Sequence, residues 1–464
     1  MKDQSRRSSF LIFGAVVAGF VLSTAGAARA QISGTTDNDV SQKSGSDSEC
    51  ATATNPANPS QVFAFCNTAG SGMLAARSTD GGATWFYPDP ADKTIVDGDP
   101  NQGPSACCDP TLTWDTFGNL FITYINSSVN GIVTILSTDG GATFSTLTTF
   151  TGSVDQPTVV AVPTTQPGAP VAVWVVWNQS GSMVARGAPV TGLGAVGAFN
   201  TLETAPGTNG CSFGDIAVSP TGVVVQSCTP SGGETGGNIL VNVDADGLGA
   251  GVFGPAIVAG TTKVGGFDFI PAQPTRSVDP ETGLQWDANP ASPHFGRLYL
   301  MYTDEVVQEA NDLDIMLKFS DDNGATWSSP PIRVNDDPAG KSQFLPKLSI
   351  DDAVGNIMIC WHDCRESATN TAMREYCTGA GTAGGSPTFL PNVPIGDGLS
   401  TTNSDGFDFG DYSGLDYTAG AGQPIWGDTS NSTGNNPNGT TNFDAQTDVV
   451  TGPVPVELMS IRIE

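Results

Sequence analysis

The residues best suited to chemistry are carboxyl groups in two short segments of the second half of the chain. Residues 361–366 read Trp-His-Asp-Cys-Arg-Glu, and residues 409–415 read Phe-Gly-Asp-Tyr-Ser-Gly-Leu. Asp411, Tyr412 and Asp363 are the candidate catalytic residues, because a carboxyl group can transfer protons and an activated phenol can act as a nucleophile. Asp411 and Tyr412 open a predicted strand, where side chains can point toward the centre of a repeat fold.

Arginines supply the candidate substrate-binding groups, because a guanidinium can clamp a carboxylate through two parallel hydrogen bonds. The three candidates are Arg276, Arg365 and Arg374, which we expect in loops after strands. The alternative for the arginines is that they pair with surface acids. The alternative for the acids is a ring of strand-end caps that satisfy backbone N–H groups, and it would comprise Asp109, Asp155, Asp215 and Asp411.

The elements that must position these residues are marked by a repeated turn. Residues 78–85 read Ser-Thr-Asp-Gly-Gly-Ala-Thr-Trp, and near-copies occupy 137–144 and 320–327. In such a turn the Asp side chain accepts hydrogen bonds from N–H groups two and three residues on, and Gly supplies a free φ. The aromatic residue packs between repeats. The residues to which we assign this structural role are Ser78, Asp80, Gly82, Trp85, Ser137, Asp139, Gly141, Phe144, Ser320, Asp322, Gly324 and Trp327.

The spacing of these turns predicts further, decayed copies. Asp80 and Asp139 are separated by about 60 residues and Asp139 and Asp322 by about three times that, as expected for a repeat fold. Glycine-rich segments that close on an aromatic residue fall near the missing positions, at Phe199, Phe253 and Phe389. A pair of predicted strands, with apolar and polar residues in alternation, precedes each turn. Counting these strand–turn units along the chain gives seven. We predict an all-β, seven-bladed β-propeller, with six blades as the alternative. Residues 276–295 are expected to form a loop over one face.

The three turn motifs resemble the Asp-box, or bacterial neuraminidase repeat, of sialidase-like β-propellers. This resemblance covers the chain after its leader. It implies peripheral, structural boxes and a sialidase-like secreted protein, with an arginine cluster, a Tyr nucleophile and an Asp acid/base. The chain departs from the family in lacking an N-terminal Phe/Tyr-Arg-Ile-Pro motif. Two hypotheses follow: a glycoside hydrolase acting on terminal or acidic sugars, or a non-catalytic propeller that binds glycan, peptide or protein.

The first 30 residues have the pattern of a signal peptide. A basic start, an apolar stretch and Ala-Arg-Ala at 28–30 predict cleavage after residue 30 and a secreted or periplasmic protein. A polar leader is expected over 31–45 and one propeller domain over 46–464. The nine cysteines suggest bridges between Cys50 and Cys66 and between Cys211 and Cys228, a vicinal pair at 107–108, and an odd thiol.

The formal charge of −29 makes nucleic acid an unfavourable partner, because both carry negative charge. Membrane insertion is not expected either, because the sequence has no second apolar stretch long enough to span a membrane. The expected partner is a carbohydrate or glycoconjugate. The protein itself is expected to be a monomer. No cofactor is expected; residues 244–247 and 311–314 offer oxygen ligands for Ca²⁺ but lack the full spacing of a calcium loop.

Overall fold

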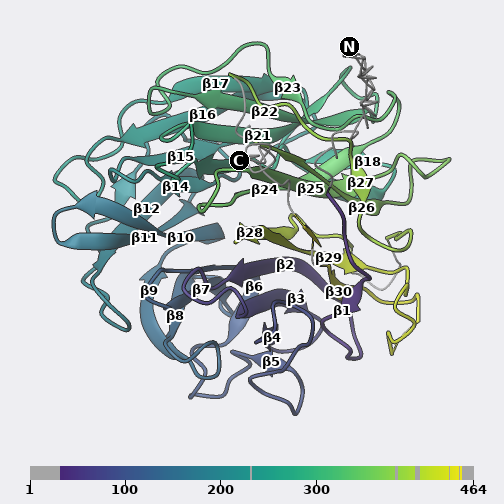
Figure 1. Ribbon diagram of the computed structural model, residues 1–464, viewed down its shortest axis with the longest axis horizontal. Helices are drawn as coiled ribbons and strands as arrows, with labels where there is room; N and C mark the ends of the chain where they lie inside the picture. Colours follow the sequence, from purple (N-terminus) through teal and green to yellow (C-terminus); the bar gives the residue numbers. More distant parts are fainter. Residues whose placement is uncertain are drawn as a thin grey trace, which may run out of the picture.

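The computed structural model describes residues 32–229, 232–381, 385–402, 408–437, 439–448 and 450–451. In these ranges every regular element is a β-strand, as the sequence predicts. The proposed signal peptide and residues 452–464 lie outside the described residues. The strands form seven sheets of four or five antiparallel strands, which follow one another around a ring (Figure 1). The prediction of seven blades is confirmed.

Each blade is a meander in chain order, from the innermost strand outward. The strands of blades one and two are β2 (Asp47–Thr54), β3 (Val62–Thr68), β4 (Met73–Ser78), β5 (Thr94–Ile95), β6 (Ala106–Trp114), β7 (Leu120–Asn126), β8 (Gly131–Ser137) and β9 (Ser145–Thr151). Those of blades three and four are β10 (Val154–Gln166), β11 (Ala169–Gln179), β12 (Ser182–Val190), β13 (Glu203–Thr204), β14 (Ile216–Val218), β15 (Val224–Cys228), β16 (Gly237–Asp244) and β17 (Ile257–Thr262).

Blades five to seven continue the same order. Their strands are β20 (Gly283–Trp286), β21 (Leu298–Glu305), β22 (Leu313–Ser320), β23 (Ile332–Arg333), β24 (Gln343–Ile350), β25 (Ile357–Asp363), β26 (Arg374–Ala380), β27 (Val393–Pro394), β28 (Gly414–Thr418), β29 (Ala421–Asp428), β30 (Asp444–Thr447) and β31 (Val450–Thr451). A separate hairpin of β18 (Asp268–Ile270) and β19 (Gln273–Val278) precedes blade five. The expectation of a loop over 276–295 was therefore wrong, because that range includes the end of β19 and the inner strand β20.

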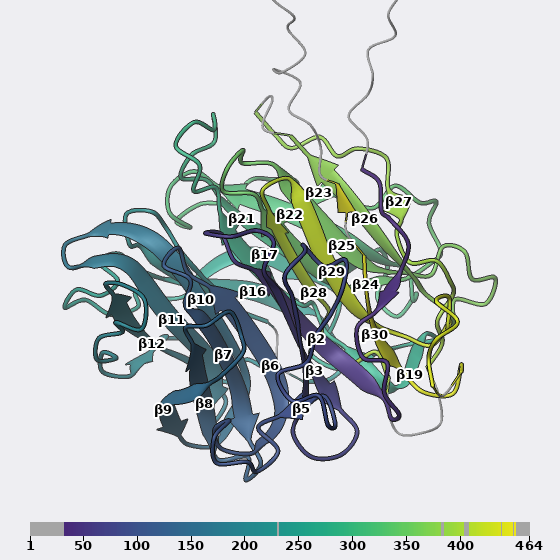
Figure 2. The same ribbon diagram turned by 60° about the horizontal axis from the view of Figure 1, so that its bottom comes forward.

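The ring is closed by the start of the chain. Strand β1 (Asn38–Asp39) pairs antiparallel with β30, with Asn38 opposite Thr447. The N–H of Val40 donates to the carbonyl of Ala445 at 2.8 Å, and the Val40 side chain is fully buried. Figure 1 places β1 beside β30, and Figure 2 shows the same purple segment against the yellow last blade. The segment expected as a polar leader thus supplies the outer strand of blade seven.

Seven apolar cores lie between successive blades, and each contains the aromatic residue that ends one turn motif or its decayed copy. Each aromatic packs against the blade that precedes its own, which explains why the residue type survives where the rest of the turn motif has decayed. The aromatics, one per core, are Trp85, Phe144, Phe199, Phe253, Trp327, Phe389 and Phe443. The residue spacing therefore counts the blades correctly.

The repeated turn joins the third and fourth strands of its blade and has the same hydrogen bonds in all three copies. In the first copy Asp80 accepts from the Thr84 N–H at 2.8 Å, the Thr84 hydroxyl at 2.6 Å and the Ser78 hydroxyl at 2.8 Å. Ser78 Oγ in turn accepts the Gly82 N–H at 2.9 Å. The expected bond from the N–H two residues on is absent from all three copies, because the loop is wider and its Asp reaches the fourth residue. Only Asp139 also bonds an N–H three residues on.

We expect Asp139→Ala to lower the free energy of unfolding by about 1 kcal/mol without altering the opposite face of the propeller. The carboxylate of Asp139 accepts three further bonds in its turn, from Ser137 and Thr143. Chemical denaturation measures the loss. Glu234→Ala, at an exposed position, is the control, and equal midpoints for both variants would show that the carboxylate is dispensable.

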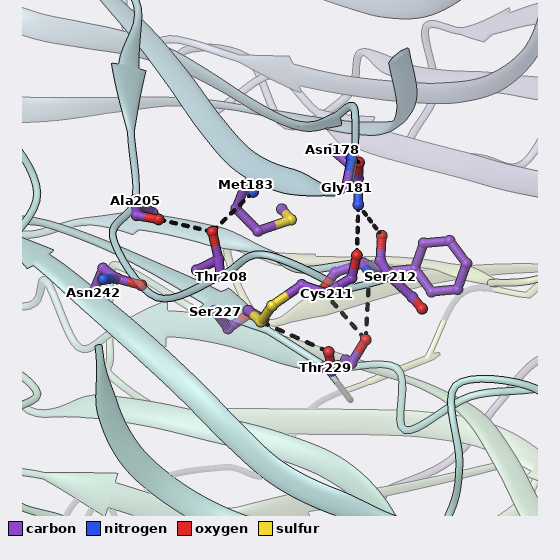
Figure 3. Close-up of a disulfide and its surroundings, with 12 residues drawn as sticks. Asn178, Gly181, Met183, Ala205, Thr208, Cys211, Ser212, Ser227, Thr229 and Asn242 are labelled. Atoms are coloured by element: carbon purple, nitrogen blue, oxygen red, sulfur yellow. Dashed lines mark hydrogen bonds between the residues drawn. A yellow bond between two sulfur atoms is a disulfide. The ribbon is translucent and has the colours of Figure 1, made fainter. Parts of the chain in front are cut away.

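Four disulfides join neighbouring segments of the described chain. Cys50–Cys66 and Cys360–Cys377 link directly opposed residues of adjacent strands. Cys211–Cys228 ties the approach of β14 to the end of β15, and beside it Asn178 donates to the Cys211 and Ser212 carbonyls (Figure 3). The vicinal pair Cys107–Cys108 is also bonded, and Cys364 is a buried free thiol. The pairings suggested by the sequence and the odd thiol are confirmed.

Candidate functional site

Four inner strands enter the centre of the propeller through the same backbone irregularity. Glu49, Asp109, Gln156 and Leu345 have φ angles of 49°, 57°, 35° and 48°. Each falls where the pairing register of its strand with the next one shifts. A left-handed residue in a strand creates a β-bulge that re-aims side chains. The carboxyl group of Glu49 lies between Asn67 of the neighbouring strand β3, which donates to Oε2, and Arg276, which donates to Oε1.

The carboxyl groups that gather at this end of the inner strands come from six blades or their lead-in segments. We call them the carboxyl ring, and its members are Glu49, Asp109, Asp155, Asp215, Asp279, Glu281 and Asp411. Each of them is within electrostatic reach of another member or of Lys347. The strand-end aspartates noted in the sequence are thus members of one cluster.

Arg276, on β19, ties two members of the carboxyl ring together. Its Nε and Nη2 atoms donate to the two oxygens of Asp411 at 2.8 and 2.6 Å, and Nη2 also donates to Glu49 Oε1 at 2.6 Å. The Asp411 N–H donates to the same Glu49 oxygen at 3.1 Å. This close approach requires Gly410, with a φ of 82°, because a Cβ there would collide with Glu49. The candidate catalytic residue Asp411 and the candidate binding residue Arg276, 135 residues apart in the sequence, are therefore in contact.

Several ring carboxyls are held close to their protonated form at neutral pH. Burial, reinforced by Asp411, raises the pKa of Glu49 to about 8 despite the contact with Arg276. Burial and the neighbouring Asp155 raise the pKa of Asp109 to about 7. The Gln156 N–H donates to Asp109 at 3.1 Å and to Asp155 at 3.2 Å, so the two carboxyl groups meet at one backbone donor. Two carboxyl groups this close disfavour each other's ionisation.

Tyr412 lies among these groups. Its hydroxyl is shut off from solvent and has no hydrogen-bond partner among the described residues. Burial, and next the charge of Asp109, raise the pKa of Tyr412 well above its usual value. Glu49, Asp411 and Glu281 contribute in the same direction. The phenol is therefore neutral and can donate or accept a hydrogen bond.

Blade five completes the carboxyl ring. Asp279 accepts the Glu281 N–H at 2.6 Å, and its other oxygen has no partner among the described residues. Burial and Asp411 raise the pKa of Asp279 to about 8. Asp215 accepts the Leu284 N–H at 2.8 Å, as expected for a strand-end cap. Lys347 faces Asp215 and Glu281 and is the cation of the inner strands in this region.

A central cavity of about 450 Å³ lies beneath the carboxyl ring. The inner strands of all seven blades line it, mostly with Pro, Thr, Ala, Val and Leu side chains. Asp215 and Glu281 of the carboxyl ring line this cavity, together with Lys347 and Tyr412. An apolar cavity of this size with a few convergent polar groups is typical of a small-molecule site.

The structure places the other predicted site residues in blade six, outside the carboxyl ring. Asp363 is fully buried, and its oxygens accept from Trp361 Nε1 at 2.8 Å and from Arg365 N and Nε at 2.8 and 2.9 Å. Arg365 lies in the turn after β25, as expected. Arg374 is the first residue of β26 and Arg276 lies on β19, so the expectation that these two arginines lie in loops was wrong. The three arginines do not gather at one point.

Arg365 and Arg374 belong to a cluster of their own. The Arg365 guanidinium lies 4.4 Å from the centre of the Tyr376 ring and donates to Asp336 at 2.7 Å. Arg374 and the Tyr376 hydroxyl both donate to Glu366, at 3.1 and 2.6 Å. These guanidinium groups are occupied by protein carboxylates.

Because burial raises the pKa of Glu49, Asp109 and Asp279 in the folded state, the protein is expected to lose stability as the pH rises. Asp279 has a pKa of about 8 in the fold against 3.8 for the free side chain, so its contribution is present below pH 4 and is lost as pH rises through 8. One such group changes the free energy of unfolding by at most about 1.4 kcal/mol per pH unit. We expect Asp279→Asn to reduce this slope and to raise the melting temperature at pH 8. Melting curves between pH 5 and 9 measure it, with Glu234→Gln as control; an unchanged slope would show that Asp279 is ionised throughout.

The calcium candidates are used within the protein. Asp246 accepts the N–H groups of Ala250 and Gly251, and Asp314 accepts from Arg333 and Asn335. Among the described residues, no three His, Cys, Asp or Glu side chains are grouped to hold a metal ion. The same residues include no helix of the length and apolar character needed to cross a membrane.

Fold and site together define a seven-bladed β-propeller with a ring of carboxyl groups at one end of its inner strands. No known family profile matches the sequence, and no curated protein matches it. Among solved structures, the BP39L lectin from Burkholderia pseudomallei aligns with a TM-score of 0.51 and 12% identity, over 88% of this chain and 99% of that chain. That likeness establishes a shared propeller fold.

Two further structures align less well. Phage phi92 endosialidase has a TM-score of 0.46 and 10% identity, over 93% of this chain and 70% of that one. The alpha-L-arabinanase of Penicillium chrysogenum has a TM-score of 0.41 and 11% identity, over 78% of this chain and 99% of that one. Likeness at this level carries nothing about the chemistry of the carboxyl ring.

Proposed function

We propose that this protein is an exported, carbohydrate-active propeller that hydrolyses a glycosidic bond at the carboxyl ring. One observation carries the proposal: Asp411 is held in a bidentate ion pair with Arg276, while burial raises the pKa of nearby Asp109 to about 7. Glycoside hydrolysis requires a carboxylic acid and a carboxylate at one site, in opposite protonation states. The neighbours of Asp109 and Asp411 set up this difference.

In the proposed reaction, Asp109 donates its proton to the oxygen of the departing sugar as the bond to the anomeric carbon breaks. The Asp411 carboxylate takes a proton from the water that attacks this carbon, so that the reaction consumes one water. The Gln156 N–H donates to both Asp109 and Asp155 and holds the acid in place. The unpartnered Tyr412 hydroxyl bonds the sugar.

Binding without turnover is the second candidate. It is favoured by the position of Arg276, which bonds Asp411 and Glu49 together. A carboxylate fixed in this way can act as a structural anchor that holds the entrance in shape. In this form the protein would retain a glycan, peptide or protein segment at the ring without cleaving it.

The direct test is a panel of chromogenic glycosides carrying neutral, acidic and amino sugars, combined with a glycan array. Release of the chromophore that disappears in Asp109→Asn supports hydrolysis. Retention on the array without release supports the second candidate. A protein that neither cleaves nor retains any glycan contradicts the carbohydrate function.

We also propose that the protein works outside the cytoplasm, in the secreted or periplasmic space. Four disulfides are present in the described chain, and such bonds persist in oxidising compartments. A monomer suffices for the proposed site, because one chain supplies all seven blades and every member of the carboxyl ring.

A further inference from the structure

The central cavity lies beside the carboxyl ring but has a wall of its own. None of Glu49, Asp109 and Asp411 lines it. Pro110 and Tyr412, which directly follow Asp109 and Asp411 in the chain, do line it. The volume of about 450 Å³ is in the range of sites that hold a drug-sized molecule. The cavity can therefore take a ligand that the proposed reaction at the ring does not use.

Two hydrogen-bond donors on this wall are vacant. The Gln156 amide nitrogen and the Tyr412 hydroxyl both line the cavity, are shielded from solvent and have no hydrogen-bond partner among the described residues. Both residues adjoin Asp109, which accepts the Gln156 backbone N–H at 3.1 Å and faces Tyr412. Buried polar atoms are almost always hydrogen-bonded, so two vacant donors at one cavity wall indicate a bound molecule that accepts from them.

The acceptors on the same part of the wall are already used. Asp215 accepts the Ile216 N–H with one oxygen and the Leu284 N–H with the other, both at 2.8 Å. Lys347 faces Asp215, so the two charges offset each other. Burial raises the pKa of Glu281 well above its usual value, so this carboxyl group is uncharged and can donate its proton. Donors are therefore in excess here, and charge is balanced.

This balance selects the chemistry of the ligand. A sugar hydroxyl donates as well as accepts, and its proton would find few free acceptors on this wall. A charged molecule would lose its hydration without gaining a counter-ion. A carbonyl oxygen has two lone pairs and no proton, so it can accept from both Gln156 and Tyr412. The rest of the wall, largely Pro, Thr, Ala, Val and Leu side chains, favours an apolar body.

We propose that the central cavity is a second binding site, which holds an uncharged, largely apolar molecule through a carbonyl oxygen. This oxygen accepts from the Gln156 amide and the Tyr412 hydroxyl, and the apolar body lies along the inner strands. The Tyr412 oxygen keeps its lone pairs for the sugar proposed at the carboxyl ring. The site is separate from glycoside hydrolysis and does not depend on it.

Calorimetry with flavanone and flavan tests the proposal, because these uncharged compounds share three rings and differ in one carbonyl group. Flavanone is expected to bind about tenfold more tightly than flavan, a ratio that one or two hydrogen bonds supply. Tyr412→Phe and Gln156→Met should each reduce this ratio and leave the binding of flavan unchanged. Gln308→Met, at an exposed position, is the matched control and should keep the ratio. Ala51→Leu, which enlarges a side chain of the cavity wall, should weaken the binding of both compounds.

Several results would overturn the proposal. If neither compound binds, water alone fills the cavity. Equal binding of flavanone and flavan removes the role of the carbonyl oxygen, and tighter binding of a flavanone carboxylate contradicts an uncharged ligand. Binding that Ala51→Leu, Tyr412→Phe and Gln156→Met leave unaffected lies elsewhere on the protein. Melting temperatures show which variants are folded, and the two polar variants decide the matter if Ala51→Leu is not. Because hydrolysis is measured separately on the glycoside panel, the failure of either proposal leaves the other standing.

Discussion

Replacing Asp411 by Asn is expected to lower glycoside turnover about 100- to 10,000-fold, the range associated with loss of a proton-transfer group. The side chain is the carboxylate of the proposed reaction, and an amide cannot accept the proton from the attacking water. An Asn oxygen can still accept from Arg276, so the contact between Arg276 and Glu49 at 2.6 Å should persist. Initial rates on the substrate found by the glycoside panel, with kcat and KM determined separately, give the measurement. We expect the loss to appear in kcat.

The matched control is Glu366→Gln, which removes one carboxylate from blade six without touching the carboxyl ring. Melting temperatures of both variants show whether the fold is retained. A kcat for Asp411→Asn within about threefold of the wild type, a loss too small for a proton-transfer group, would mean that Asp411 is an anchor for Arg276. Binding without turnover would then be the better account.

A chain that begins at Ser46 is expected to be less stable than one that begins at Ile32 by about 3–6 kcal/mol. Ile32 and Val40 are 1% and 0% exposed, and complete burial of each such side chain contributes about 1.5–3 kcal/mol. The shorter chain also loses β1 and exposes the edge of β30. Urea denaturation of the two chains measures the difference, and the same comparison tests the predicted domain boundary at residue 46.

Val40→Ala in the longer chain separates packing from strand pairing. It keeps the backbone bond to Ala445 and should cost about 1–3 kcal/mol. If the chain that begins at Ser46 has the same urea midpoint as the longer one, closure by β1 makes no contribution to stability. A truncated chain that aggregates before unfolding would support the exposed edge of β30 as the cause.

The blades could be predicted because their signals are local and repeated. The turn at Ser78, the aromatics at Phe199 and Phe253 and the strand pairs between them each arise within one unit of the chain. The disulfide between Cys50 and Cys66 follows from the same logic, since both residues lie in one strand–turn–strand segment. Local patterns define each blade, and the stacking of blade on blade then fixes how the blades are arranged.

The site could be predicted only in part, because its partners come from distant units. Asp411, Tyr412 and Arg276 stand out by residue type, but nothing in the sequence pairs Asp411 with Arg276 and Glu49. Arg365 and Arg374 were grouped with Arg276 only because all three are arginines, and the fold places them in a different blade. Sequence reasoning missed Glu49, which lies at the bulge of β2, and Asp279 and Glu281, which lie in the irregular segment between β19 and β20.

A signal for the bulges is nevertheless present in the sequence. Asp109, Gln156 and Leu345 are each followed directly by proline. Proline cannot donate to the ladder of a central strand and is confined to edges and bulges. Three inner strands that carry it at the same place indicate a shared bulge. The proline pattern therefore marks the strand ends that surround the entrance to the cavity.

The pairing of β1 with β30 also sets the order of folding steps during and after synthesis. Residues at the two sides of this seam, such as Thr35 and Asp448, are 413 positions apart. The six blades made first can form as the chain emerges, but the ring stays open until the last strand is synthesised and meets the first. A chain exported in extended form would complete its ring only on the far side of the membrane. Until then, chaperones and proteases have access to the open seam.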